Sequence, residues 1–266
     1  VATVIMKGYA NIAAGQIHYR RLHGPGDPII CLHQTASSGA MWVKLMERMR
    51  GERHFIAFDT PGFGGSFDPP DLPASMETYA DWIVEAIDSL AVSRFHIMSH
   101  HTGACIAVEI AKKHPERLLS LAMIGPVPLT DAERAEFKKH YSSPFSPTAD
   151  GSYLNATWEY LRALGADRDL ALHHREVVDT LRAYMGRFYA YSNVWRQDFN
   201  TPFMAVKAPM LLLAAPDDVL YPFFGRARQM RPDAEWAELK GANFEPDLDP
   251  DGLATVYRAF LDRHEA

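Results

Sequence analysis

A histidine stands at the centre of a strand, turn and helix pattern near the middle of the chain. In "FHIMSHHTGACIAVEIAKKHP", an apolar strand leads into a sharp turn and a helix, and His101 occupies the turn. Small residues, Ser99 and Gly103, stand two positions before and two positions after it. A turn that presents a strained central side chain needs this spacing, because small neighbours let the strand and helix pack closely. The pattern predicts that the imidazole of His101 is presented for chemistry.

Other frames of the same turn do not place a hydroxyl at its tip. With Ser99 at the tip, the flanking small positions would be Ile97 and His101, and neither residue is small. With Thr102 at the tip, His100 would take a small position. The turn is therefore assigned to His101.

An imidazole at this position suits proton transfer. Histidine has an unperturbed pKa near ~6.5, so a neutral ring can act as general base on a water or on a substrate C–H or O–H group. Direct attack by the ring on a carbonyl would form an acyl-imidazole, which we rank below general-base action. We therefore interpret His101 primarily as a base.

The elements that position this turn alternate between strand and helix. The opening "GYANIAA" and "QIHYRRL" predict a hairpin with Gly15 in its turn. Continuous apolar runs, typical of strands buried on both faces, follow in "PIICLHQ", "HFIAFD", "RFHIMS", "LLSLAMIGPV" and "APMLLLAAP". Helical patterns separate these runs, and the strand "AEWAELKG" precedes a closing helix. The alternation predicts a parallel α/β sheet with helices on its faces.

The alternation stops between about residues 130 and 200. Here the pattern predicts helices without strands, and the segment is rich in Tyr, Trp and Phe. We interpret 130–200 as a helical cap on a core formed by 1–129 and 201–266. Side chains of the cap that are expected to line a ligand pocket, unless they serve only in packing, are His140, Tyr153, Trp158, Tyr184, Tyr191 and Trp195.

Four further segments occur in a recognisable order around the turn: "CLHQTASSGAMW", "FDTPGFGGSFDPP", "APDDVLYP" and "LKGANFEPDLDPDGLATVYRAFL". With the turn, they make the chain resemble α/β-hydrolase-fold proteins with a helical cap, similar to epoxide hydrolases, haloalkane dehalogenases and meta-cleavage-product hydrolases. The resemblance covers nearly the whole chain. It implies an eight-stranded, mostly parallel sheet with helices on both faces and a helical cap.

The resemblance also implies a catalytic set, from which this chain departs at two positions. The nucleophile position holds His101 in place of Ser, Asp or Cys, and the usual histidine of the last loop is Asn243. The acid is retained as Asp218. A carboxamide takes up no proton near neutral pH, so the serine-hydrolase mechanism does not transfer. We expect a polar set of His101 and Asp218, with Asn243 either orienting the imidazole or filling space.

The oxyanion hole implied by the resemblance is retained. It would use the backbone N–H of Thr102 and that of Gln34 or Thr35. His33 and His100 are counted with the substrate-binding candidates His140, Trp158, Tyr184 and Trp195, with a structural role as the alternative for the first two. His33, His100, His101 and Asp218 are also metal-ligand types, but adjacent histidines on a strained turn point in different directions, so no metal is expected.

Composition limits the class of protein. The chain has 266 residues, 47% of them hydrophobic, and a formal net charge of -6 without a Lys or Arg run. This balance argues against a nucleic-acid or anionic-membrane partner. Cys31 and Cys105 lie in apolar runs, so no disulfide is expected and a reducing cytoplasm fits. No apolar stretch reaches the ~18 residues of a membrane span. A homo-oligomer is left open.

These residues predict an enzyme without a cofactor that acts on a small carbonyl compound. The favoured reaction is hydrolytic or lyase-type cleavage of an ester, lactone or β-dicarbonyl, with His101 as base. One alternative is proton abstraction like that of the cofactor-free dioxygenases that share this fold. Another is a member of the fold that binds a small ligand without turnover.

Overall fold

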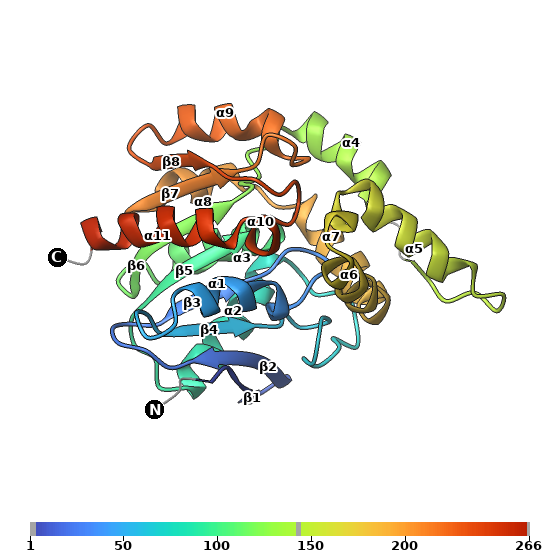
Figure 1. Ribbon diagram of the computed structural model, residues 1–266, viewed down its shortest axis with the longest axis horizontal. Coiled ribbons are helices and arrows are strands. Elements are labelled where there is room, and N and C mark those ends of the chain that lie inside the picture. Colours follow the sequence, from blue (N-terminus) through green and yellow to red (C-terminus); the bar gives the residue numbers. More distant parts are fainter. Residues whose placement is uncertain (1–3, 142–144, 265–266) are drawn as a thin grey trace.

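The computed structural model describes residues 4–141 and 145–264. Within them the chain forms an eight-stranded sheet in the order β1-β2-β4-β3-β5-β6-β7-β8 (Figure 1). Its strands are β1 (Met6–Ile12), β2 (Gly15–Leu22), β3 (Ile29–Leu32), β4 (Phe55–Phe58), β5 (Phe95–His100), β6 (Leu118–Ile124), β7 (Met210–Ala214) and β8 (Glu235–Glu238). Strand β2 pairs antiparallel with β1 and β4, and the remaining pairs are parallel. The predicted hairpin and mostly parallel sheet are confirmed.

Helices cover both faces of the sheet, which explains why the central strands are continuously apolar. Every residue of β3, β4, β5 and β7 is buried. One face packs on α2 (Met76–Ser89), α3 (Thr102–Lys113), α8 (Asn200–Ala205) and α9 (Tyr221–Met230). The other packs on a 3-10 turn (Gly39–Trp42), α1 (Val43–Arg48) and α11 (Pro250–His264). The two cysteines are buried free thiols within these layers.

The cap helices project beyond the α/β core, at the right of Figure 1. They are α4 (Asp131–Tyr141), α5 (Ser152–Ala163), the 3-10 turn η2 (Ala166–Arg168), α6 (Leu170–Arg182) and α7 (Tyr184–Val194). The backbone of helix α7 at Gly186 packs directly on the core loop at Gly62. A Cβ at Gly186 would lie 2.2 Å from the Gly62 carbonyl oxygen. None of the helices in the described ranges is long and apolar enough to cross a bilayer.

The predicted small residue after the turn is required by packing between α3 and β3. A Cβ on Gly103 would lie 2.3 Å from the carbonyl oxygen of Leu32, which is main chain and cannot move aside alone. Helix α3 therefore packs so close to β3 that only glycine fits at position 103. A short helix, α10 (Glu245–Leu248), lies directly before α11 and was not predicted.

Substitution of Gly103 tests this close approach. Gly103→Ala is expected to lower the free energy of unfolding by about 1–3 kcal/mol or more, because α3 must shift away from β3. Gly225→Ala is the matched control, since Gly225 lies within α9 and an added methyl group would meet open space there. That change should raise the free energy of unfolding by about 0.5–1 kcal/mol. Urea unfolding measures both, and equal effects of the two changes would contradict the packing argument.

Candidate active site

The turn between β5 and α3 holds His101 in a strained conformation. Its φ of 45° and ψ of -108° lie outside the regions that non-glycine residues normally adopt. Such a conformation costs of order 1–3 kcal/mol and persists where surrounding bonds determine it. Here the N–H of His101 donates to the Ile124 carbonyl at 2.9 Å, and its own carbonyl accepts from the Ala104 N–H at 2.8 Å. The backbone is thus fixed on both sides of the imidazole.

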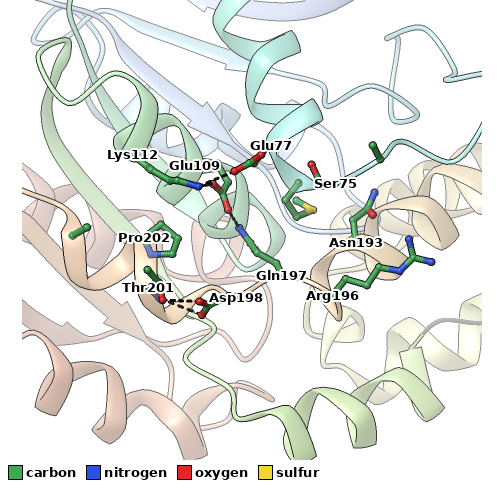
Figure 2. Close-up of a pocket in the computed structure, with 13 residues that line it drawn as sticks. Ser75, Glu77, Glu109, Lys112, Asn193, Arg196, Gln197, Asp198, Thr201 and Pro202 are labelled. Atoms are coloured by element: carbon green, nitrogen blue, oxygen red, sulfur yellow. Dashed lines mark hydrogen bonds and ion pairs between the residues drawn. The ribbon is translucent and has the colours of Figure 1, made fainter.

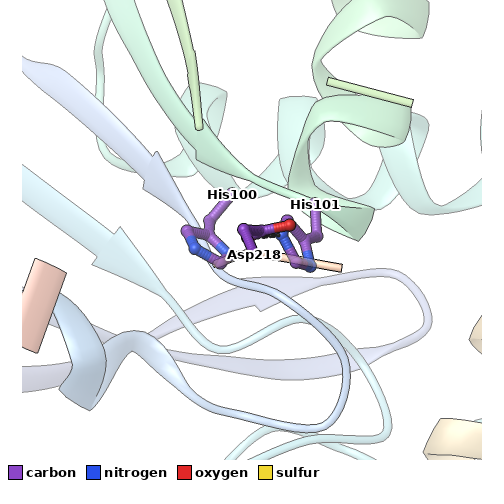
Figure 3. A group of neighbouring side chains, drawn as sticks. All are labelled: His100, His101 and Asp218. Carbon is purple, nitrogen blue, oxygen red and sulfur yellow. Dashed lines mark hydrogen bonds and ion pairs between the residues drawn. The ribbon is translucent and has the colours of Figure 1, made fainter. Parts of the chain in front are cut away.

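The imidazole of His101 reaches directly to Asp218. Its Nε2 lies 2.6 Å from Oδ2 of Asp218. Figure 3 shows the two side chains side by side. The second oxygen, Oδ1, accepts from the Leu220 N–H at 2.5 Å. A carboxylate only accepts hydrogen bonds, so Nε2 carries the hydrogen and Nδ1 carries the lone pair. The Asp218 side chain is fully buried, whereas 13% of the His101 side chain is exposed.

Gly125 makes room for this ring and was missed by the sequence analysis. It follows β6 with a φ of 59°, and a Cβ there would lie 2.2 Å from Cδ2 and 2.4 Å from Nε2 of His101. The imidazole therefore lies against the main chain at the end of the neighbouring strand. The available signal was a glycine directly after an apolar run in "LLSLAMIGPV".

A second polar pair lies behind the first. His100 and Glu245 are fully buried, and Nε2 of His100 lies 2.8 Å from Oε2 of Glu245. Burial and the nearby Asp218 charge raise the pKa of Glu245 well above its usual range. Burial and the neighbouring His101 lower the pKa of His100. Both shifts favour an uncharged pair, with the proton on Glu245.

This burial corrects one expectation about His100. The residue was a candidate for substrate binding, but its ring packs under that of His101, with centroids 4.3 Å apart and planes inclined by 26°. It ends β5, where every residue is buried by the helices on both faces. His100 therefore supports the turn from behind and contacts no ligand from there.

Three side chains at the turn, His100, His101 and Asp218, are close enough together to be considered as metal ligands. Ligand atoms of His100, His101 and Asp218 lie within 4.8 Å of one another (Figure 3). The lone pairs of an imidazole lie in the ring plane, and these two rings are stacked, so an ion between them would lie outside both planes. The geometry fits a hydrogen-bonded acid–base pair better than a shared metal.

Two adjoining small cavities meet at His101. They share His101, Tyr141, Tyr191 and Val219 in their walls. Each cavity has a volume of about 40 Å³. Two adjoining spaces of this size beside His101 suit a compact ligand. The cavities separate the turn from the cap helices α4 and α7.

The residues expected to form an oxyanion hole lie on these walls. Gln34 and Thr35 line the first cavity, and Thr102 lines the second, each together with His101. Thr102 is the first residue of α3, where backbone N–H groups have no partner within the helix. The side chain of Gln34 donates to the Asn243 carbonyl at 2.9 Å, which holds this loop against the last loop.

Asn243 lines the first cavity but is engaged elsewhere. Its Nδ2 donates to the Leu164 carbonyl at 3.1 Å, and its Oδ1 accepts from the Val219 N–H at 3.3 Å. Leu164 belongs to the cap and Val219 to the loop after β7. The two hydrogen bonds use the amide to join cap and core, and the imidazole of His101 is oriented by Asp218 instead.

His33 positions the loop that carries Gln34. Its Nε2 accepts from the Thr60 N–H at 2.9 Å, so Nδ1 carries the hydrogen and donates to the Gln34 carbonyl at 2.7 Å. Burial lowers the pKa of His33, which favours this neutral form. His33 is absent from the walls of the two cavities beside His101, which favours the structural alternative given for it above.

The cap candidates divide into two groups. Tyr191 and Trp195 line the cavities beside His101. His140 lies outside the walls of both cavities, since its side chain is 64% exposed and pairs with Glu136 one helical turn away. The described walls also lack Trp158, which stacks on His173, as well as Tyr153 and Tyr184. Cap residues in the walls that the sequence analysis missed are Phe137, Tyr141, Tyr160, Glu176, Thr180 and Arg187.

Serines near the turn donate to acceptors other than imidazole. Ser99 donates to the Ala122 carbonyl inside the sheet. Ser37 donates to Glu176 and Ser38 donates to Asp179, each at 2.8 Å, and both serines are buried. Burial and the nearby Glu176 raise the pKa of Asp179 to about 7. These contacts fasten α6 to the loop after β3.

A larger hollow lies away from this site. Its volume is about 450 Å³, and residues of α2, α3 and the segment after α7 line it (Figure 2). Its polar side chains are largely paired with one another: Lys112 with Glu77, Gln197 with Glu109, and Thr201 with Asp198. His101 and Asp218 are not in its walls. Its size alone does not outweigh the paired acid and base at the turn.

Comparisons with known proteins agree with this architecture. The sequence profile of the alpha/beta hydrolase fold family matches residues 27–206. RutD of Variovorax paradoxus, assigned as a carbamate hydrolase, is 24% identical over 220 residues, which are 78% of this chain and 80% of RutD. The structure of E-2-(acetamidomethylene)succinate hydrolase covers 97% of this chain and 100% of its own, with a TM-score of 0.79 and 21% identity.

A third comparison gives the same result. The enol-lactonase from Burkholderia xenovorans LB400 covers 96% of this chain and 100% of its own, with a TM-score of 0.77 and 18% identity. At such identities, the structural likeness establishes a common fold and nothing about the residues at the turn.

Gly125 offers a test of how the imidazole is held. Gly125→Ala should lower the free energy of unfolding, because the new methyl group would overlap His101 and a positive φ disfavours alanine. In a His101→Ala background the overlap is absent, so the cost should shrink by about 0.5–3 kcal/mol. Urea unfolding of the two single variants and the double variant measures this coupling. Additive effects would contradict the packing of the ring on Gly125.

Asp179 predicts a pH-dependent stability. Between about pH 4 and pH 7 the folded protein keeps a proton on Asp179 that the unfolded chain releases, so its contribution to stability falls as pH rises through that window. In Asp179→Asn this loss is absent. The difference in Tm, that of the variant minus that of the unmodified protein, should therefore increase by about 2–4 °C or more from pH 4 to pH 8.

Thermal melts across that range measure the effect, with Asp71→Asn as the control. Asp71 is exposed, so its substitution should shift Tm by the same small amount at every pH. A difference between Asp179→Asn and the unmodified protein that stays flat from pH 4 to pH 8 would contradict the raised pKa of Asp179.

Proposed function

Because this chain belongs to the alpha/beta hydrolase fold family, we propose that it is a hydrolase in which His101 acts as general base on a small carbonyl compound. The observation that carries the proposal is the 2.6 Å hydrogen bond from Nε2 of His101 to the buried carboxylate of Asp218. It leaves Nδ1 as the proton acceptor. In this arrangement one side chain supplies the base at the position from which other members of the family present a nucleophile.

The proposed reaction needs one water and the groups around the cavities. Nδ1 of His101 takes a proton from the water as the water oxygen bonds to the substrate carbonyl carbon. The developing negative charge on the carbonyl oxygen is stabilised by the N–H of Thr102 and that of Gln34 or Thr35. The carbon–heteroatom bond then breaks, and the imidazolium returns its proton to the leaving group. Asp218 stabilises the imidazolium between the two steps.

The relatives support an acyl bond as the bond cleaved. RutD is assigned as a carbamate hydrolase, and the two structural neighbours are named as a hydrolase of an acetamido compound and an enol-lactonase. We therefore favour an ester, lactone, carbamate or related carbonyl as the substrate. The small cavities limit it to a compact molecule.

A second candidate reaction uses the same base without water. Nδ1 of His101 would abstract a proton from a hydroxyl or an acidic C–H of the substrate, as in lyase or cofactor-free dioxygenase chemistry. The feature that favours this candidate is the aromatic wall beside His101, formed by Phe137, Tyr141, Tyr191 and Trp195. A flat hydroxyaromatic or β-dicarbonyl would fit such a wall.

Substitution of the base separates an enzyme from a protein that only binds. Against a panel of small esters, lactones, carbamates, β-dicarbonyls and hydroxyaromatics, His101→Ala should lower kcat/KM about 100-fold or more for any substrate turned over. Asp218→Asn should act in the same direction, because it no longer fixes the tautomer. Asp71→Asn, at an exposed position outside the walls of both cavities, is the control and should leave turnover unchanged. Full activity in His101→Ala would overturn the proposal.

A fluorophosphonate probe tests the absence of serine chemistry. We expect no adduct by intact mass, because Ser37, Ser38 and Ser99 donate to carboxylates or a carbonyl and not to an imidazole. A single stable adduct that disappears in Ser37→Ala would instead identify an activated serine and restore the ordinary serine mechanism.

A further inference from the structure

The hollow of Figure 2 has the size of a small-molecule pocket and is separate from the site at His101. Its volume of about 450 Å³ lies within the roughly 300–1,000 Å³ that ligand pockets usually have. The end of α7 lies between the two sites: Val194 and Trp195 line a cavity at the turn, whereas Asn193 and Gln197 line the hollow. A ligand in the hollow would therefore leave the space beside His101 open.

Three buried oxygen atoms of the hollow's walls accept no hydrogen bond from any residue that the structure describes. They are Oε2 of Glu109, Oδ1 of Asn193 and Oε1 of Gln197. The three residues are 4%, 1% and 9% exposed, respectively. A buried acceptor without a donor is costly, and buried polar side-chain atoms usually have a partner. A ligand that donates hydrogen bonds to these oxygens would remove that cost.

The other polar atoms of these side chains hold them in place. Nε2 of Gln197 donates to Oε1 of Glu109 at 2.7 Å and to the Cys105 carbonyl at 2.9 Å. Nδ2 of Asn193 donates to the Pro73 carbonyl at 3.0 Å. Asn193 lies one helical turn before Gln197, whose N–H donates to the Asn193 carbonyl at 3.0 Å. One carboxylate and two amides thus form a continuous, fixed set of acceptors.

The charge of the walls also favours a donor that is a cation. Three carboxylates line the hollow, those of Glu77, Glu109 and Asp198. Lys112 serves two of them, because its Nζ donates to Glu77 at 2.8 Å and lies 3.6 Å from Oε2 of Glu109, too far for a hydrogen bond. Arg196 is exposed and extends away from Glu109 in Figure 2. The buried part of the wall therefore has more negative charge than its own cation neutralises.

We propose that this hollow is a second ligand site, which binds a small primary amine in its ammonium form. A primary ammonium has three N–H donors, the same number as the unpartnered oxygens. Apolar side chains complete the walls and suit a short aliphatic or aromatic body: Ala74, Met76, Pro202 and Ala205. The inference does not depend on the proposed function, because the hollow shares no wall residue with the cavities at His101.

Binding of benzylamine and benzyl alcohol tests the inference without turnover. The two probes differ only in carrying an ammonium or a hydroxyl group on the same body. By titration calorimetry at pH 7, the unmodified protein should bind benzylamine about 10-fold or more tightly than benzyl alcohol, because its hydrogen bonds to the wall are charge-assisted. Equal binding, tighter binding of the alcohol, or no binding of either probe would overturn the inference.

Two tryptophan substitutions at exposed positions locate the bound amine. Ala205→Trp places an indole in the hollow and should weaken binding of benzylamine about 10-fold or more. Met204→Trp is the matched control, since Met204 is the exposed neighbour outside the walls, and it should leave the affinity within about 2-fold. Unchanged binding in Ala205→Trp would place the amine elsewhere and contradict the inference, as would an equal loss in both variants.

A change of charge at Glu109 tests the role of the acceptors. Glu109→Gln keeps an oxygen for Gln197 but removes the negative charge, so it should lower the preference for benzylamine about 10-fold. Asp81→Asn is the control, because Asp81 also pairs with a lysine, Lys113, but lies outside the walls. Circular dichroism checks folding, and if Glu109→Gln does not fold, the two tryptophan variants decide. A folded Glu109→Gln with the full preference would refute the assignment.

Discussion

The strained backbone at His101 is the constraint on which the rest of the site depends. A residue with positive φ at the junction of β5 and α3 can persist only if both of its peptide groups are held, and Ile124 and Ala104 hold them. The same strain aims the side chain away from the sheet and over Gly125, where it meets Asp218. Close packing of Gly103 on Leu32 keeps the helix from relaxing.

Charge is arranged in layers around this turn. Behind it, His100 and Glu245 form a buried pair that burial keeps uncharged. At the turn, the carboxylate of Asp218 faces the imidazole of His101. In the cap above, the guanidinium of Arg187 is surrounded by aromatic rings. Because the His100–Glu245 pair is uncharged, no second full negative charge lies beside Asp218. This lowers the free-energy cost of burying the Asp218 carboxylate.

Much of the fold could be predicted from the sequence, since apolar runs and their alternation with helical patterns depend on local periodicity. Asp218 was assigned as the acid from the resemblance of "APDDVLYP" to a family segment, but its distance from His101 could not be predicted. Gly125 and Glu245 were missed because their roles exist only once distant segments meet: the methyl group that Gly125 lacks matters only beneath an imidazole. The cap was harder still, because aromatic residues at helical spacing are equally suited to packing, as Trp158 on His173 illustrates.

The amide of Asn243 spans from Leu164 in the cap to Val219 beside Asp218. Under the proposed function the base is carried on the turn, so the last loop does not have to hold an imidazole beside a nucleophile. Its amide instead joins the cap to the loop that carries Asp218. A substitution at 243 that lacked the donor or the acceptor of this amide would therefore disturb the cap at Leu164 or the loop beside Asp218, and one that lacked both would disturb the two together.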